Sequence, residues 1–215
     1  MTDLQRLFDA VLNGDAKTAA AVTHEALADK VPPMDLIQKY MIPAMDEVGK
    51  RFECEDYFVP ELLLSARAMK AALEPLRPLL AAVGAEPVGR VVIGTVKGDL
   101  HDIGKNLVAS MLEGGGFEVI DLGTDVSPEK FIDAVKTRNA NIVCLSALLT
   151  VTMPSMRTTI DALKSAGVRD KVKVMVGGAP VTEQFAREIG ADAFGENAGT
   201  AVQIARKLTS SGIAA

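Results

Sequence analysis

The stretch VVIGTVKGDLHDIGKNLVASMLEGGGFEVIDLG, residues 91–123, decides the fold. It begins with an apolar run rich in β-branched residues, passes through a polar loop into a helical pattern over 104–114, and ends in a second such run at 117–123. Three more β-rich runs, each followed by a helical pattern, lie at 141–147, 173–178 and 191–194. These five strand–helix alternations predict an α/β domain over residues 90–215 with a doubly wound parallel sheet, in which four strands are buried on both faces.

A sheet of this size favours the flavodoxin-like (Rossmann-like) strand order 2-1-3-4-5. In such a sheet, ligands bind beyond the carboxyl ends of the strands, here strands 1, 3, 4 and 5. We therefore expect the chemistry of the protein at that edge.

The N-terminal part has a different texture. Residues 1–83 are predicted to be helical throughout, as four short helices joined by short turns, which is typical of a small bundle. Residues 84–89, rich in glycine and proline, are expected to form a linker.

Caps and prolines predict where these helices begin. Thr2 followed by Gln5 is typical of a capping box, and Asp15 is expected to cap the second helix. Pro43 is expected to break or restart the third helix, and Pro60 suits the first turn of the fourth.

Charge and hydropathy exclude several classes of protein. The net charge is −5 and no run of Lys or Arg stands out, which argues against a nucleic-acid partner or an anionic membrane surface. The longest apolar stretches fall short of the ~18–20 residues that cross a bilayer, and the N-terminus carries acids where a signal peptide needs bases. We therefore expect a cytoplasmic protein without a membrane partner.

Cysteine and histidine are scarce. Cys54 and Cys144 lie far apart without CxxC spacing, which predicts free, mostly buried thiols and neither a disulfide framework nor a zinc site. Only His24 and His101 can supply imidazole chemistry.

The loop after the first strand, KGDLHDIGKN, is the most informative part of the predicted edge. It lacks the G-x-G-x-x-G of a dinucleotide site, and no Ser or Thr follows its Gly-Lys pair, as a Walker loop requires. A phospho-acceptor receiver domain would need an Asp at the end of the third strand, which ends instead in Ser146-Ala147-Leu148. The loop does present His101, with Asp99 two residues before it.

This pair favours a metal that arrives already coordinated. A histidine that binds a metal through one ring nitrogen usually donates its other N–H to a carboxylate, and Asp99 can serve His101 in that way. A protein-only transition-metal site takes three or four protein ligands, whereas one imidazole is on offer here. A macrocycle with one free axial position fits.

The other loops of this edge are small and hydroxyl-rich. The third strand ends in SALLTVT (146–152), the fourth in Gly177-Gly178-Ala179-Pro180, and the fifth runs into Gly195-Glu196-Asn197. Glycines and small hydroxyl residues let a ligand approach the backbone, although for Gly177-Gly178 alone a turn with positive φ is the commoner explanation.

Three motifs together resemble one family. Asp99-x-His101-x-x-Gly104, Ser146-x-Leu148 and Gly177-Gly178 are similar to the cobalamin-binding motifs of methionine synthase and of the corrinoid proteins that serve methylamine, methanol, betaine and aryl-ether methyltransferases. Residues 48–76 resemble the helical cap module that precedes the cobalamin domain in that family. The resemblance implies a cap domain at 1–83 and a cobalamin-binding domain at 90–215.

The resemblance also implies roles for individual residues. His101 would be the cobalt ligand in base-off/His-on cobalamin, Asp99 its hydrogen-bonded partner and Thr152 the third member of the network. The rest of the implied cofactor site comprises the loop residues Gly98, Leu100, Asp102, Ile103 and Gly104, the tail-slot residues Ser146, Leu148 and Thr150, the nucleotide-side residues Gly177, Gly178, Gly195, Glu196 and Asn197, and the cap residues Phe52 and Val59.

The activity implied is methyl carriage, with cobalt cycling between cobalt(I) and methylcobalt(III). The expected partners are a substrate-specific methyltransferase, a second methyltransferase that uses a folate or coenzyme M, and a reductive activase. The alternative is a cobalamin-dependent sensor or regulatory module, which would be expected to carry a DNA-binding helix-turn-helix and a basic patch. A self-contained isomerase would need a substrate barrel from another chain.

Overall fold

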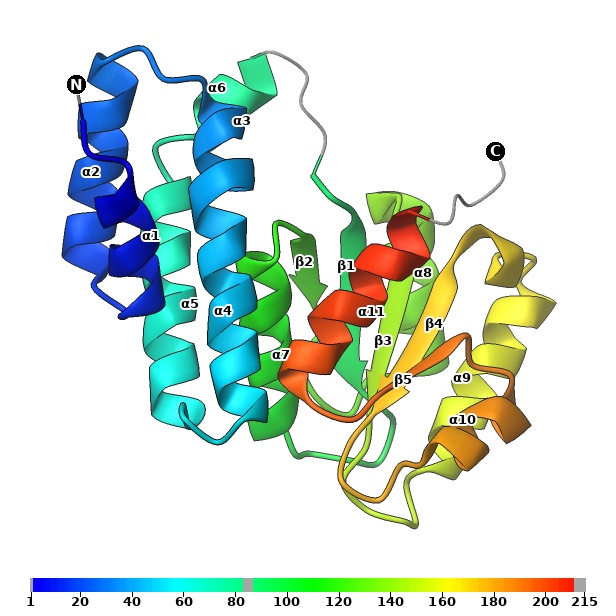
Figure 1. Cartoon of the computed structure of the whole chain (residues 1–215). Helices are drawn as coiled ribbons and strands as arrows, with labels where there is room; N and C mark the ends of the chain where they lie inside the picture. Colours follow the sequence, from blue (N-terminus) through cyan, green and yellow to red (C-terminus); the bar gives the residue numbers. More distant parts are fainter. Residues whose placement is uncertain (1, 83–86, 211–215) are drawn as a thin grey trace. The chain divides into compact units, whose positions relative to one another are not determined.

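The computed structural model describes residues 2–82 and 87–210 (Figure 1). The chain divides into two compact units, which are Met1–Pro87 with Glu113–Gly116 and Val88–Leu112 with Phe117–Ala215. Residues 84–86 of the expected linker lie outside the described residues, so the limits expected for the two domains stay a prediction.

The α/β unit contains a parallel sheet in the order β2-β1-β3-β4-β5, which confirms the flavodoxin-like prediction. Its strands are β1 (Arg90–Thr95), β2 (Glu118–Asp121), β3 (Ile142–Ser146), β4 (Lys173–Gly177) and β5 (Ala193–Gly195). Thr95 pairs with Ser146, Ser146 with Gly177, and Gly177 with Gly195. Four strands therefore end in one row, and the loops that follow them leave from one edge.

Helices cover both faces of this sheet. They are α7 (Ile103–Gly114), α8 (Pro128–Arg138), α9 (Pro154–Ser165), α10 (Glu183–Ile189) and α11 (Ala198–Ser210), with a 3-10 turn η2 (Arg169–Lys171) before β4. Figure 1 shows α7 and α11 on one face and α8, α9 and α10 on the other. Under the second group, alternate residues of β1, β3 and β4 pack against Phe131, Met156 and Ile160. Every strand is thereby followed by the helix that covers it.

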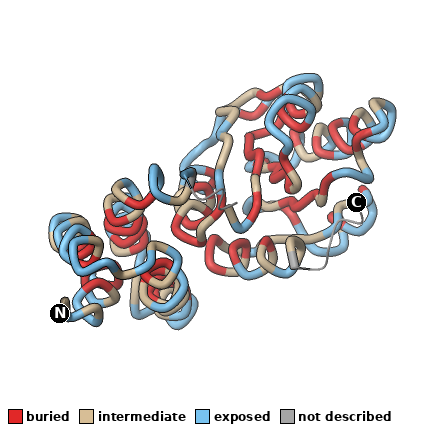
Figure 2. Tube along the Cα trace, turned by 90° about the horizontal axis from the view of Figure 1, so that it is seen from above, coloured by how far each residue is buried: buried red, intermediate tan, exposed pale blue. Residues whose placement is uncertain are grey.

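The prediction of four strands buried on both faces is wrong for β2. Glu118 and Asp121 are exposed, and the two residues between them are only half-buried, whereas β1, β3 and β4 are largely buried. Figure 2 shows buried residues on the inner sides of the helices and exposed residues on their outer sides. The reason is position, because β2 pairs with β1 alone and forms the edge of the sheet. An apolar run does not reveal whether a strand has one neighbour or two.

The other unit is helical. Its helices are α1 (Gln5–Leu12), α2 (Ala16–Ala28), α3 (Pro33–Leu36), α4 (Ile42–Glu53), α5 (Val59–Leu73) and α6 (Arg77–Ala82), with a π-helical turn η1 (Ile37–Met41) between α3 and α4. Apolar residues of α1, α2, α4 and α5 form its core. Asp15 accepts a hydrogen bond from the Thr18 N–H at 3.0 Å, which confirms the predicted cap of α2. The four-helix prediction lacked the short α6.

The capping box predicted at Thr2 and Gln5 is wrong. Helix α1 begins at Gln5 itself, and the Gln5 N–H donates to Asp3 Oδ1 at 3.1 Å, with no part played by Thr2. The Thr2 hydroxyl and N–H donate instead to Asp29, 27 residues away, at 2.9 and 2.6 Å. A partner that distant in sequence cannot be seen in a local motif.

Pro43 lies at a restart of the third helix, one of the two predicted alternatives, because η1 ends at Met41 and α4 begins at Ile42. The chain stays helical from Pro33 to Glu53, with Pro43 in the first turn of α4. Because proline has no N–H to donate to the carbonyl four residues earlier, a wider turn at η1 accommodates it.

The two cysteines differ from each other. Cys144 is buried in β3, and burial raises the pKa of its thiol to about 12. Cys54 is exposed, so the prediction of mostly buried thiols is wrong for it. Among the described residues, none of the helices has the length and apolar character that crossing a bilayer requires.

Candidate functional site

The loop that joins β1 to α7 carries the predicted carboxylate and imidazole. The Asp99 side chain is fully buried, whereas 51% of the His101 side chain is exposed. Asp99 Oδ1 lies 3.0 Å from His101 Nδ1 and also accepts a hydrogen bond from the His101 N–H at 3.1 Å. One carboxylate oxygen therefore fixes both the ring and the peptide of the histidine.

The second oxygen of Asp99 connects this loop to the loop after β3. Oδ2 accepts hydrogen bonds from the Thr152 hydroxyl at 2.6 Å and from the Leu148 N–H at 2.8 Å. The Leu149 N–H lies 3.3 Å from the same oxygen. The structure thus brings together the predicted Asp99, His101 and Thr152, which are separated by up to 53 residues in sequence.

Hydrogen bonding decides the charge of Asp99. Burial raises the pKa of the carboxyl, but the hydrogen bonds from Thr152, Leu148 and His101 outweigh burial and hold the pKa well below its usual range. An ionised carboxylate only accepts hydrogen bonds, so His101 Nδ1 carries the hydrogen. In the neutral ring, Nε2 then keeps its lone pair, which is the form that binds a metal.

Further contacts hold the backbone of the loop. Asp125, in the loop after β2, accepts from the Gly98 N–H at 2.8 Å and pairs with Lys97 at 3.0 Å. The Thr95 hydroxyl donates to the His101 carbonyl at 2.7 Å. The sequence did not single out Thr95 or Asp125, since a threonine in a strand and an aspartate in a loop are common and neither lies in a motif.

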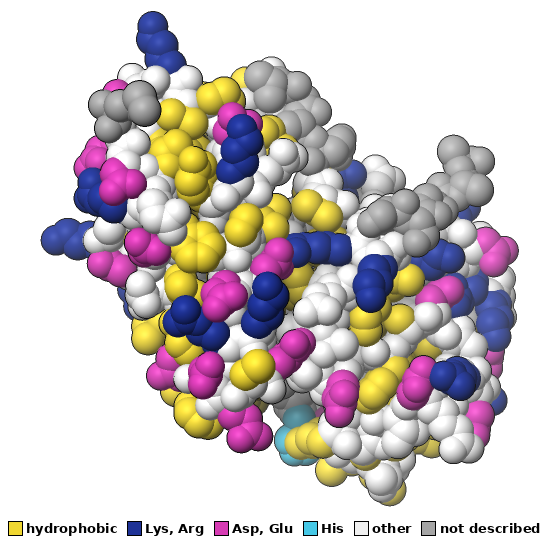
Figure 3. Space-filling view, in the orientation of Figure 1, with side chains coloured by type: hydrophobic (Ala, Val, Ile, Leu, Met, Phe, Trp, Pro, Cys, Tyr) yellow, Lys and Arg dark blue, Asp and Glu magenta, His cyan; other side chains and the backbone are white. Residues whose placement is uncertain are grey.

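Exposed apolar side chains accompany His101 in this unit. Leu100, Ile103 and Val151 are 73%, 81% and 80% exposed, unusually high for large apolar residues. Leu148 and Leu149 are each 42% exposed. Figure 3 shows yellow side chains beside a cyan histidine at the lower margin of the view. Leu149 and Val151 were missed as site candidates, although both lie within the quoted SALLTVT; their apolar character at a ligand edge was the available signal.

The paired glycines at the end of β4 are required by close packing. Gly178 has φ +128°, and a Cβ there would lie 1.9 Å from the Ala147 carbonyl oxygen. A Cβ on Gly177 would lie 2.9 Å from the Gly195 carbonyl oxygen. The expected turn with positive φ is therefore present at Gly178, and the ends of β3, β4 and β5 approach too closely for side chains.

Gly104 is different, because the fold does not need it. A Cβ at this position, in the first turn of α7, would have no atom within 4 Å. The space at Gly104 is open, and a side chain at this position would occupy it.

The other predicted site residues fall into four groups. Gly98 and Asp102 belong to the His101 loop, and Ser146 and Thr150 lie at the end of β3 and in its loop. At the start of α11, Asn197 Oδ1 accepts from the Thr200 N–H at 2.8 Å, so this side chain serves as a cap, while Glu196 beside it is exposed. Phe52 (half-buried, last turn of α4) and Val59 (40% exposed, first residue of α5) belong to the helical unit.

The donor set fits a metal that brings its own ligands. Within residues 2–82 and 87–210, no three His, Cys, Asp or Glu side chains are grouped to hold a metal ion. The site offers one metal ligand, a half-exposed imidazole with a fixed tautomer. Exposed apolar side chains and a glycine with open space around it provide an apolar surface beside that ligand. A flat macrocyclic metal complex matches that arrangement, whereas a bare transition-metal ion does not.

Comparisons with known proteins agree with this geometry. Two family models, each described as a B12 binding domain, match residues 89–205 and 3–77. A protein of Methanosarcina acetivorans named trimethylamine corrinoid protein 1 is 44% identical over 202 residues, covering 93% of this chain and 94% of that protein.

Two solved structures are similar over nearly the whole chain. A cobalamin-binding protein from Desulfitobacterium hafniense matches with a TM-score of 0.81 at 38% identity, covering 97% of this chain and 99% of that one. The methanol:cobalamin methyltransferase complex of Methanosarcina barkeri contains a chain that matches with a TM-score of 0.86 at 28% identity, covering 98% of this chain and 81% of that one.

Proposed function

Because the chain belongs to the family of B12-binding corrinoid proteins, we propose that it carries a methyl group on a bound corrinoid between two methyltransferases. The observation that carries the proposal is the pair of Asp99 and His101, in which a buried carboxylate fixes the ring of a half-exposed imidazole. When bound, the corrinoid supplies a cobalt centre that accepts a methyl group and gives it up again.

The chain's own residues would hold and tune that centre. His101 Nε2 would hold the metal of the corrinoid, since Nδ1 is committed to Asp99. Leu100, Ile103 and Val151 would supply an apolar surface for the macrocycle. The remaining predicted residues of the α/β unit would receive the nucleotide tail, while the role of Phe52 and Val59 in the helical unit stays a prediction.

Asp99 and Thr152 determine where a proton taken up by His101 would reside. Asp99 stays ionised because its hydrogen bonds from Thr152, Leu148 and His101 hold its pKa low. A proton that took the place of the metal at Nε2 would therefore stay on the His101 ring, which faces the ionised Asp99 carboxylate. A metal and a proton would compete for one atom, Nε2 of His101.

The relatives support a substrate-specific methyltransferase as one of the proposed partners. One match is named for trimethylamine and another comes from a methanol methyltransferase complex, so the methyl donor is proposed to be a methylated amine or alcohol held on a substrate-specific methyltransferase. A second methyltransferase, using a folate or coenzyme M, would take the methyl group, and a reductive activase would restore the reduced corrinoid. Donor choice then lies in the partner and not in this chain.

Reconstitution tests the proposal. The purified chain is loaded with hydroxocobalamin, reduced, and mixed with a trimethylamine methyltransferase and trimethylamine, and the visible spectrum is followed. We expect the spectrum of methylated corrinoid to appear only when enzyme and amine are both present. His101→Ala should bind corrinoid more weakly, by about 10- to 100-fold, and shift its spectrum.

His24→Ala is the matched control, because His24 is the other imidazole of the chain and lies exposed on α2. It should behave like the wild type. An unchanged spectrum in His101→Ala contradicts the ligand assignment. Binding without methylation, with every methylamine and methanol enzyme tried, would favour the sensor alternative.

A further inference from the structure

Lys105 is a buried lysine that the proposed ligation does not use. It lies in the first turn of α7, and only 2% of its side chain is exposed. Its Nζ lies 2.5 Å from Asp121 Oδ2, at the end of β2, and donates to Asn106 Oδ1 at 2.7 Å. Because a buried ammonium is unfavourable without a charged partner, this contact holds the start of α7 and the end of β2 together.

Asp121 connects this ion pair to the peptide of His101. Its other oxygen, Oδ1, accepts from the Gly123 N–H at 2.8 Å. The Gly123 carbonyl accepts from the Thr95 N–H at 3.0 Å, and the Thr95 hydroxyl donates to the His101 carbonyl at 2.7 Å. Four successive hydrogen bonds thus link Lys105 to the histidine backbone through Asp121, Gly123 and Thr95.

A second path returns to the same loop. Asn106, which accepts from Lys105, donates through Nδ2 to Asp102 Oδ2 at 3.1 Å. Asp102 directly follows His101 in the chain. The hydrogen bonds therefore form a closed circuit that leaves the His101 peptide and comes back one residue later, with the Lys105–Asp121 pair as its charged link.

The circuit and Asp99 hold the histidine from different sides. β1 lies between β2 and β3 in the sheet. Asp99 fixes the His101 ring through groups of the loop after β3, whereas the circuit runs through β2 and fixes the His101 carbonyl. Asp99 therefore holds the His101 ring and its backbone N–H, whereas the circuit holds the His101 carbonyl.

Resting on the proposed role of His101 as the cobalt ligand, we infer that Lys105 and Asp121 are positioning residues for that ligand. They touch neither the imidazole nor the metal. They set where the His101 backbone stands, and with it how far Nε2 can reach.

The first measurement needs no cofactor. The chain contains two histidines, so protein labelled with ¹⁵N at histidine alone gives ring signals from His101 and His24 only. In the wild type we expect a single His101 ring environment with the hydrogen on Nδ1. In Lys105→Met, which keeps the apolar stem and removes the charge, the His101 signals should shift and broaden, while those of His24 stay unchanged.

The second measurement uses the same labelled protein loaded with cobalamin in its cobalt(II) form. An axial ¹⁵N from His101 splits each cobalt line of the EPR spectrum into two, whereas the ¹⁴N of the cofactor's own base splits it into three. The wild type should show the two-line pattern, and Lys105→Met should lose part of it and bind cobalamin about 10-fold more weakly.

Two further variants separate positioning from plain stability. Lys105→Met/Asp121→Leu removes both charges, so it should recover stability relative to the single variant without recovering the His101 signals. It also keeps the test valid if the single variant does not fold. Glu118→Gln breaks the ion pair that Glu118 makes with Arg90 at 2.9 Å, at the amino end of the same strand, and should leave His101 unchanged.

The outcomes distinguish the two proposals. Wild-type His101 signals and EPR splitting in both Lys105 variants overturn the positioning role, whatever happens to stability. If the labelled wild type shows no two-line splitting, the ligand proposal fails, and the cofactor-free spectra alone decide whether Lys105 and Asp121 position the histidine.

Discussion

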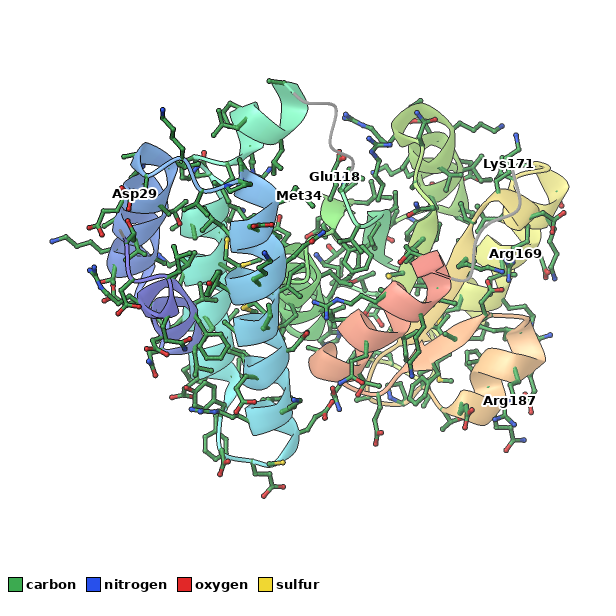
Figure 4. All side chains as sticks on the ribbon, turned by 45° about the horizontal axis from the view of Figure 1, so that its top comes forward. Asp29, Met34, Glu118, Arg169, Lys171 and Arg187 are labelled. Carbon is green, nitrogen blue, oxygen red and sulfur yellow. The ribbon has the colours of Figure 1, made fainter. Side chains whose placement is uncertain are left out.

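The two edges of the sheet are built on opposite principles. At the amino ends of the strands, charged and polar groups satisfy one another: Arg90 pairs with Glu118 at 2.9 Å, and the Asn141 side chain accepts from the Arg90 N–H at 2.9 Å. Before β4, Arg169 pairs with Asp192 at 2.7 Å, and Asp192 also accepts from the Val174 N–H at 2.7 Å. Glu118 and Arg169 are labelled in Figure 4.

At the carboxyl ends of the strands, by contrast, large apolar side chains are exposed to water. Leu100, Ile103 and Val151 are mostly exposed, a carboxylate is buried beneath an imidazole, and Gly104 faces open space. The polar groups named at the amino edge are paired within the protein, whereas the features of the carboxyl edge fit a bound ligand. A functional site can therefore be located by looking for the edge of the sheet where apolar side chains are left exposed.

We expect the largest loss of stability from a substitution at Gly178, at the carboxyl edge, where a side chain would collide with the backbone. Gly178→Ala places a Cβ against the Ala147 carbonyl at a positive φ, so we expect a loss of about 4 kcal/mol in the free energy of unfolding. Gly167→Ala, with φ +67° and no atom within 4 Å of the new Cβ, should cost only about 1 kcal/mol. Urea unfolding measures both, and equal losses would show that the close approach at Gly178 is not what requires glycine.

Asp99→Asn tests the buried carboxylate. The amide cannot accept all the hydrogen bonds that Asp99 receives, so stability at pH 7 should fall by about 1–3 kcal/mol and corrinoid affinity by about 10- to 100-fold. Because the folded protein holds the pKa of Asp99 below its usual value, the carboxylate stabilises the fold at neutral pH and loses this effect as the pH falls below about 4. The difference from the wild type should therefore shrink at pH 3; a constant difference would contradict the ionised state.

Asp192→Ala is the corresponding change at the amino edge. It leaves the buried Val174 N–H without its side-chain acceptor and Arg169 without its carboxylate, so we expect a loss of about 1–2 kcal/mol. Corrinoid affinity, measured by spectral titration, should not change. A drop in affinity as large as that of Asp99→Asn would remove the distinction between the two edges.

Gly104→Ala has the smallest effect on the fold and the most specific one on function. Alanine fits the open space in α7 and favours helix, so the cofactor-free protein should gain up to about 1 kcal/mol of stability. Corrinoid affinity should fall, because the added methyl group would occupy the open space at Gly104 that the ligand is expected to use. A gain in stability without a loss of affinity would show that the space at Gly104 is not used by the ligand.

The sequence predicts much of this molecule because local patterns carry it. The runs expected at 141–147 and 173–178 and the helix expected at 104–114 lie within one residue of β3, β4 and α7, since apolar periodicity and strand–helix alternation are local signals. The network of Asp99, His101 and Thr152 was expected from a motif resemblance, and its hydrogen bonds are present.

What sequence missed depends on contacts between distant residues. Whether β2 has one neighbour or two, and that Thr2 pairs with Asp29, are decided by the assembled fold. Lys105 looks like an ordinary surface lysine at the start of a helix until Asp121, 16 residues later, is brought against it. Residues that act through others leave no local pattern.

The Asp99 carboxylate also sets an order on the growing chain. Its partners Leu148 and Thr152 follow it by 49 and 53 residues, so His101 leaves the ribosome well before the groups that orient it. A nascent chain that ends before Thr152 has the Asp99–His101 pair but lacks the hydroxyl that donates to the second oxygen of Asp99. The arrangement that holds the His101 ring is therefore complete only after β3 and the loop that follows it have been made.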